Sequence, residues 1–239
     1  MDDHAMATDN TKTDINQDKA TYVWDVPTRL FHWGLVGAVA TSLVAGEFGY
    51  MDIHVMSGHV VLALILFRLA WGFFGGKHAR FSDFVKGPGT VLAYARKLIS
   101  GNAPAHSGHN PMGALSVIAV LVVLIVQVST GLFANDDILT EGPLASEVSK
   151  STSDYLTYIH YRSGYVLYGL IGLHLAAVLF YTFKGHPIVV AMISGKMRGL
   201  PENPVTDSPS SQNKLRGSWI AAIIFAGIAS AIAYGILTY

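Results

Sequence analysis

The sequence predicts an all-α integral membrane fold, a four-helix transmembrane bundle followed by a fifth, C-terminal transmembrane helix. Of its 239 residues, 51% are hydrophobic and only 13% are charged, whereas a soluble domain carries about a quarter charged residues. In addition, five stretches are apolar over the roughly 20 residues that a bilayer-spanning helix requires. These stretches cover residues 29–48, 55–76, 112–134, 159–183 and 218–239.

The segments between these stretches divide the chain into a tail, a membrane domain and a linker. Residues 1–21 are polar and contain no apolar run, which predicts a disordered cytoplasmic tail instead of a cleaved signal peptide. The membrane domain then covers residues 22–198. Proline, asparagine and serine are frequent in 199–217, so we expect a flexible linker there before the last helix.

Lysine and arginine are distributed unevenly between the connections. Segments 77–110 and 184–217 are basic, whereas 47–53 and 135–158 are acidic. Because short basic loops stay in the cytoplasm, we expect a multi-pass protein of the bacterial inner membrane with a cytoplasmic N-terminus and a periplasmic C-terminus. The acidic segment 135–158 would then face outward, where it would attract a positively charged redox protein such as a c-type cytochrome.

The composition also excludes several kinds of chemistry and partner. The chain has no cysteine, which rules out thiolate metal sites, iron–sulfur clusters and covalently attached haem. Its 16 basic and 16 acidic side chains cancel, so nucleic acid is not an expected partner, because phosphate binding needs a basic surplus. Redox or metal chemistry must therefore depend on the ten histidines.

Two of these histidines begin the same motif, His-x-x-x-Gly. It comprises His54 and Gly58 in the second apolar stretch, and His160 and Gly164 in the fourth. We expect both histidines to open their helices at the outer face and hence to lie at the same depth. Residues four apart share a helix face, so each glycine leaves a patch without a side chain one turn deeper, on which a flat macrocycle can rest.

A second pair follows from spacing within one helix. His160 and His174 are 14 residues apart, which separates them by about 21 Å along the helix and by only about 40° around it. His174 lies toward the cytoplasmic side, where His32 also lies near the start of the first helix. An intramembrane histidine marks a functional site by default, so the sequence predicts two pairs, His54 with His160 and His32 with His174.

The pairing favours haem over zinc. Zinc takes three or four protein ligands, and the apolar stretches offer no third ligand at either depth. Haem iron accepts two axial imidazoles, and a non-covalent b-type haem needs no Cys-x-x-Cys-His motif. Iron with six ligands has no open position for oxygen, which indicates electron transfer.

Arg68 is a permanent cation inside the second apolar stretch. It lies 14 residues beyond His54, at the expected depth of the inner haem, where its guanidinium would pair with a haem propionate. Arg162 and Arg29 are candidates for the same role near the outer and inner haem. The alternative for Arg68 is a snorkelling arginine at a helix end.

Together these residues resemble the bacterial di-haem cytochrome b561 family, close to the b-type cytochrome subunit of nickel–iron hydrogenases. The resemblance implies a four-helix bundle that binds two b haems through His32, His54, His160 and His174. The chain departs from the family at His59, where tyrosine or an apolar residue is usual, and in its fifth helix, which indicates a partner or an assembly role. The resemblance runs from about residue 22 to 198 and is carried by Phe31-His32-Trp33, Ile53-His54, Gly58, Arg68, His160, Gly164, Leu173 and His174.

The expected function is transmembrane electron transfer between a periplasmic redox partner, such as a c-type cytochrome or a hydrogenase, and the membrane quinone pool. The chain would act as a subunit of a larger complex. Quinone is expected at the inner haem, near Arg29, Trp33, His78 and Arg80, because a reduced quinone needs polar partners and access to protons. Two alternatives stay open: a free-standing superoxide-oxidising quinone reductase and a haem-free membrane transporter or scaffold.

The remaining histidines of the membrane domain are expected at the surface or in loops. His59 is the one that merits a test, because rotation of its helix would exchange it with His54 as a ligand. The others are His78, His106, His109 and His186.

Overall fold

The computed structural model describes residues 21–76, 79–101, 110–197 and 209–238. Five of its helices are long and apolar enough to cross a membrane, which confirms the predicted all-α membrane fold. The predicted tail lies outside the described residues except for its last position. The five helices are α2 (Val26–Glu47), α3 (Met51–Phe74), α6 (Pro111–Gly131), α7 (Lys150–Phe183) and α9 (Pro209–Leu237).

The long helices begin where capping residues stand in the sequence. Asp25 accepts a hydrogen bond from the Thr28 backbone N–H at the start of α2, and Asn110 accepts one from Gly113 at the start of α6. Each satisfies an N–H group that has no partner inside the helix. A proline follows directly in the first turn of both helices, where its missing N–H costs nothing.

Two predicted boundaries are wrong. Helix α7 begins at Lys150, capped by the Ser149 side chain, so His160 lies well inside the helix instead of opening it. The hydropathy signal missed 150–158 because these polar and tyrosine residues extend the helix beyond its apolar part. Likewise α9 begins at Pro209, so 209–217 is helical instead of a flexible linker, and 199–208 lies outside the described residues.

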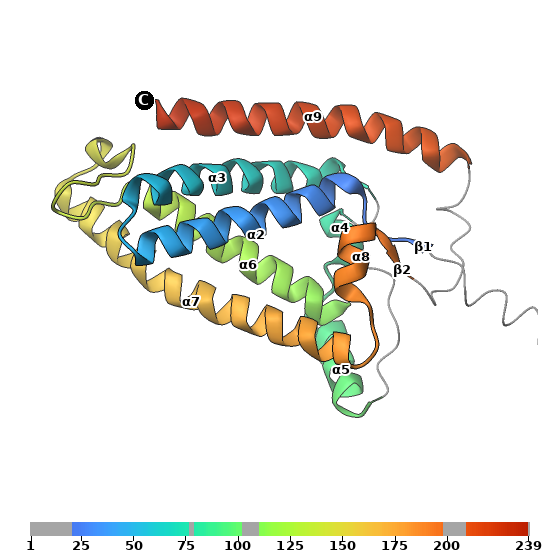
Figure 1. The fold of residues 1–239 in the computed structure, drawn as a ribbon. Helices are drawn as coiled ribbons and strands as arrows, with labels where there is room; N and C mark the ends of the chain where they lie inside the picture. The colour runs from blue at the N-terminus through green and yellow to red at the C-terminus, as the bar shows by residue number, and fades with distance from the viewer. Residues whose placement is uncertain (1–20, 77–78, 102–109, 198–208, 239) are drawn as a thin grey trace, which may run out of the picture.

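Four of the five spanning helices form two antiparallel pairs (Figure 1). Helix α2 packs on α3 and α6 packs on α7, while α3 also contacts α6. Helices α2 and α7 share few backbone contacts. We call the end that carries the α6–α7 connection, residues 132–149, the outer end, after the predicted orientation, and the opposite end the inner end.

Shorter elements gather at the inner end (Figure 1). Strands β1 (Thr21–Tyr22) and β2 (Lys196–Met197) form an antiparallel pair, which ties the start of the bundle to the segment after α7. The short helix α8 (Ile188–Ser194) packs against both α7 and β2. The remaining elements are α4 (Phe81–Phe84), α5 (Pro88–Ile99) and, in the outer connection, the 3-10 helix η1 (Ala145–Glu147).

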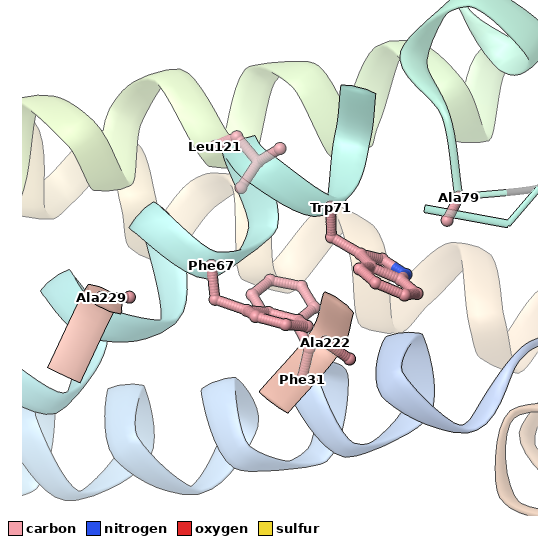
Figure 2. Close-up of a cluster of buried hydrophobic side chains, with 7 residues drawn as sticks. All are labelled: Phe31, Phe67, Trp71, Ala79, Leu121, Ala222 and Ala229. Atoms are coloured by element: carbon pink, nitrogen blue, oxygen red, sulfur yellow. The ribbon is translucent and has the colours of Figure 1, made fainter. Parts of the chain in front are cut away.

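Helix α9 is packed along α3 and is part of the hydrophobic core. Figure 2 shows Ala222 and Ala229 of α9 beside Phe67 of α3 in one buried cluster. Phe225 of α9 also stacks on Phe74, with ring centres 5.5 Å apart. Small residues let two membrane helices approach closely, so the fifth helix covers α3 at the side of the four-helix bundle.

Candidate haem-binding sites

The outer histidine pair lies between α3 and α7. The ring centres of His54 and His160 are 6.0 Å apart, and the ring planes are nearly perpendicular. Both side chains are partly buried and both line one cavity near the outer end. The structure therefore brings together the two histidines that the repeated motif places at one depth.

Each outer ring is anchored on the backbone of a neighbouring helix. The Nδ1 atom of His54 lies 2.8 Å from the Ser42 carbonyl oxygen of α2, and Nδ1 of His160 lies 2.9 Å from the Gln127 carbonyl oxygen of α6. A carbonyl only accepts, so Nδ1 carries the proton, and Nε2 of the neutral ring keeps its lone pair. This tautomer, held by a second partner, is typical of a metal-binding histidine.

Two glycines make this anchoring possible. A Cβ atom on Gly46 of α2 would lie 2.9 Å from Nδ1 of His54, and one on Gly131 of α6 would lie 2.9 Å from Cε1 of His160. Each glycine follows the anchoring carbonyl by four residues, so the ring rests on one bare helical turn. Sequence reasoning missed both glycines, although a polar residue four positions before glycine in an apolar span was a usable signal.

The inner histidine pair lies between α2 and α7. The ring centres of His32 and His174 are 6.5 Å apart. The ring centres of His32 and Trp33 are 5.2 Å apart, and their planes are nearly perpendicular. Nδ1 of His32 is buried without a hydrogen-bond partner among the described residues, while His174 is exposed on its helix. The predicted inner pair is thus brought together, but without the carbonyl anchors of the outer pair.

Both separations fit two imidazoles on one metal ion. Metal–imidazole bonds of about 2.0–2.1 Å, together with about 1.1 Å from each nitrogen to its ring centre, place such ring centres about 6 Å apart. Among the described residues, no group of three or more His, Cys, Asp or Glu is arranged to hold a metal ion. The donor set is therefore two imidazoles per site, which suits haem iron and is too few for zinc.

The two glycines of the repeated motif have different surroundings. Gly58 lines the outer cavity, and a Cβ atom there would meet nothing within 4 Å. Gly164 is buried on the α6 side of α7, where the nearest atom to such a Cβ is Nε2 of Gln127 at 3.7 Å. A bare patch for a macrocycle thus exists at Gly58, whereas Gly164 serves the contact with α6.

Arg68 is buried, with 3% of its surface exposed. Its guanidinium lies 4.7 Å from the ring centre of Phe81, 5.8 Å from that of Phe84 and 6.0 Å from that of Phe31. Nη1 has no hydrogen-bond partner among the described residues. Aromatic faces attract a cation, and the Asp25 carboxylate interacts electrostatically with this guanidinium. Nη1 is the part of the group that lacks an acceptor among these residues, and an unpaired buried donor is costly.

The residues predicted for quinone lie only partly within the described chain. His78 lies outside it, and Arg80 is exposed on the inner connection. Arg29 and Trp33 both hydrogen-bond to backbone carbonyls of α8, at Ile193 and Met192. Helix α2 is thereby joined to α8 next to the inner histidine pair.

The outer connection is folded over the outer cavity. Pro143 lines the cavity, and one carboxylate oxygen of Asp136 accepts the backbone N–H groups of Ile138, Leu139 and Thr140. These hydrogen bonds lower the pKa of Asp136 to about 2. Two other acidic side chains at the outer end are partly neutralised, because Lys150 forms ion pairs with Asp137 and Asp154.

Comparison with known proteins agrees with this geometry. Residues 23–195 match the family model described as prokaryotic cytochrome b561. A probable Ni/Fe-hydrogenase B-type cytochrome subunit from Azotobacter vinelandii is 26% identical over 158 residues, and one from Azotobacter chroococcum mcd 1 is 25% identical over 158 residues. Each match covers 54% of this chain and 65% of the relative. No solved structure matches.

The matched segment contains both histidine pairs and all four helices that carry or anchor them. It ends before α9, which is therefore an addition to the matched bundle. The family binds b-type haem and transfers electrons in membranes, as the two-imidazole sites predict. The chain belongs to the prokaryotic cytochrome b561 family.

Proposed function

We propose that the protein binds two b-type haems, the outer one through His54 and His160 and the inner one through His32 and His174. In this proposal it transfers electrons between a redox protein on the periplasmic face and the quinone pool, in the bacterial inner membrane. When bound, haem supplies reversible one-electron chemistry. The observation that carries the proposal is the presence of two imidazole pairs with metal-sharing separations of 6.0 and 6.5 Å.

The depth of the two pairs supports transfer across the membrane. His160 and His174 both belong to α7 and lie 14 residues apart, which corresponds to about 21 Å along the helix. One pair therefore lies near each side of an apolar core about 30 Å thick. Two cofactors at these depths bridge most of the membrane without any movement of the protein.

The side chains around each pair hold and insulate the cofactor. Ser42 and Gln127 fix the outer rings through their carbonyl oxygens, and apolar residues of α2, α3 and α6 line the cavity and exclude water. Arg68 offers its guanidinium to a propionate of the inner haem. Arg162, exposed on α7 two residues beyond His160, is proposed for a similar role at the outer haem.

The redox partner is proposed to be a hydrogenase, because the matched relatives are named as hydrogenase cytochrome subunits. A c-type cytochrome is the second candidate for the same face. Asp136, Glu141 and Glu147 are exposed on the outer connection, and their negative charge would attract a basic docking surface. Quinone is proposed to bind at the inner end, between Arg29 and Trp33, where polar groups meet the lipid.

The proposal is tested by haem quantitation with reduced-minus-oxidised absorption spectra on purified full-length protein. We expect two haems per chain in the parent and one in each of His160→Ala and His174→Ala. The spectral component lost in His160→Ala is then that of the outer haem, and the component lost in His174→Ala is that of the inner haem. A parent protein with one haem or none would contradict two independent sites. The same conclusion would follow if one of the two variants lost both haems while the other variant retained both.

A further inference from the structure

His59 is a third imidazole at the outer cavity, and the proposed haem ligation does not use it. Its side chain lines the same cavity as His54 and His160. Only 8% of the residue is exposed, so it is one of the few buried polar groups of the bundle. Among the described residues it belongs to no three-ligand cluster that could hold a metal ion, so it is not an additional ligand in this arrangement.

The hydrogen bonding of His59 fixes which nitrogen carries the proton. Nδ1 lies 2.8 Å from the Val55 carbonyl oxygen, one turn earlier in α3. Because a carbonyl only accepts, Nδ1–H is the donor, and Nε2 of the neutral ring keeps a lone pair. Nε2 is buried and has no hydrogen-bond partner among the described residues, so nothing there offsets its negative partial charge.

The direction of this dipole has an electrostatic consequence. His59 follows His54 by five residues in α3, about 7.5 Å along the helix, and both side chains line the same cavity. Ferric haem carries one more positive charge than ferrous haem. A negative partial charge in a low-dielectric cavity stabilises the more positive state, and thereby favours oxidised over reduced iron.

We propose that His59 lowers the reduction potential of the outer haem by directing the unpaired Nε2 lone pair into the cavity that His54 and His160 share. This inference rests on the proposed function, because it requires haem at the outer pair. His59 acts here as a positioning residue that places a dipole, and it neither binds the iron nor exchanges a proton in the transfer.

The test is an equilibrium redox titration of both haems in the full-length protein, comparing the parent with His59→Leu. Leucine fills similar space without a dipole. At the parent's outer midpoint potential, we expect the reduced-to-oxidised ratio of the outer haem to rise by at least about threefold, where tenfold corresponds to 59 mV for one electron. The inner haem is expected to keep its potential.

Two further variants separate the dipole from packing. His59→Gln can donate its amide N–H to the Val55 carbonyl and turn its own oxygen toward the cavity, so it should restore most of the parent potential. Leu62→Ala alters an apolar residue of the same cavity. It should shift the potential of the outer haem less than His59→Leu does. An equal shift in Leu62→Ala, or none in His59→Leu, would overturn the inference.

Haem content distinguishes failure of this inference from failure of the proposed function. If the parent holds no outer haem, the proposed function is wrong. If the parent holds two haems but His59→Leu loses the outer one as completely as His160→Ala does, His59 is a ligand and the dipole role is wrong.

Discussion

The outer and inner histidine pairs have similar separations but very different supports. At the outer end, each ring donates to a backbone carbonyl and rests on a glycine of the adjacent helix. At the inner end, Nδ1 of His32 is buried without a partner among the described residues and His174 is exposed. The outer pair is therefore oriented by the protein itself, whereas the inner pair relies more on what it binds.

The difference shows how a helix bundle builds a preorganised metal site. Ligands held in place before binding lose less freedom when the metal arrives, which raises affinity. A backbone carbonyl is a rigid anchor, but a ring reaches it only where the covering side chain is absent. The outer site thus depends on Gly46 and Gly131 as much as on the polarity of the anchoring groups.

The largest expected difference between the two sites comes from Gly131→Ala. Its methyl group would lie 2.9 Å from the His160 ring, and such overpacking costs about 1–3 kcal/mol. We expect the outer haem to bind about tenfold more weakly, while the inner haem is retained. The measurement is a titration of haem into protein from which haem has first been removed. Gly37→Ala is the control, since a Cβ there meets nothing within 4 Å. Equal loss of both haems would refute the separate role of Gly131.

An effect of similar size, but at the inner site, is expected from Arg68→Met. The buried guanidinium stacks on Phe31, which neighbours His32 in sequence, so removing its positive charge should favour oxidised inner haem. We expect the inner midpoint potential to fall by roughly 60 mV, a tenfold change for one electron, and the outer potential to stay constant. Arg68→Lys keeps the positive charge, so the inner midpoint potential should fall less in this variant. A shift confined to the outer haem would contradict the placement of Arg68.

The smallest effect concerns the acid sensitivity of the outer connection. The pKa of Asp136 is lowered to about 2 from its ordinary 3.8, so its contribution to loop stability is complete above about pH 4 and is lost as the pH falls through about 2. The protection of the Ile138, Leu139 and Thr140 amides against hydrogen exchange, relative to the intrinsic exchange rate at each pH, should fall over that range. In Asp136→Ala, these three backbone amides should exchange rapidly at neutral pH. An exchange rate equal to that of the parent would show that the carboxylate does not hold the turn.

Under the proposed function, His59 and Arg68 act in the same direction on electron transfer. The His59 lone pair would lower the potential of the outer haem, and the Arg68 cation would raise that of the inner haem. Electrons entering from the periplasmic side would then move energetically downhill toward the inner end. The titrations of His59→Leu and Arg68→Met test the two halves of this gradient independently.

Much of the site was predictable from spacing along single helices. The helical repeat places His160 and His174 on one face, and the repeated motif assigns His54 to His160, as the structure shows. The start of α7 was not predictable from hydropathy, because polar residues 150–158 continue the helix beyond its apolar part. The aromatic surroundings of Arg68 also escaped prediction, since Phe31 comes from α2 and Phe81 and Phe84 come from α4.

The sequence by itself determined the membrane fold and the spacing of the histidines along each helix, because hydropathy and the rise per residue of a helix depend only on local order along the chain. Only the tertiary structure decided which backbone carbonyls receive the imidazoles, which glycines lie under them and where the His59 lone pair is buried. These depend on the register between neighbouring helices, which packing sets and a single helix cannot specify.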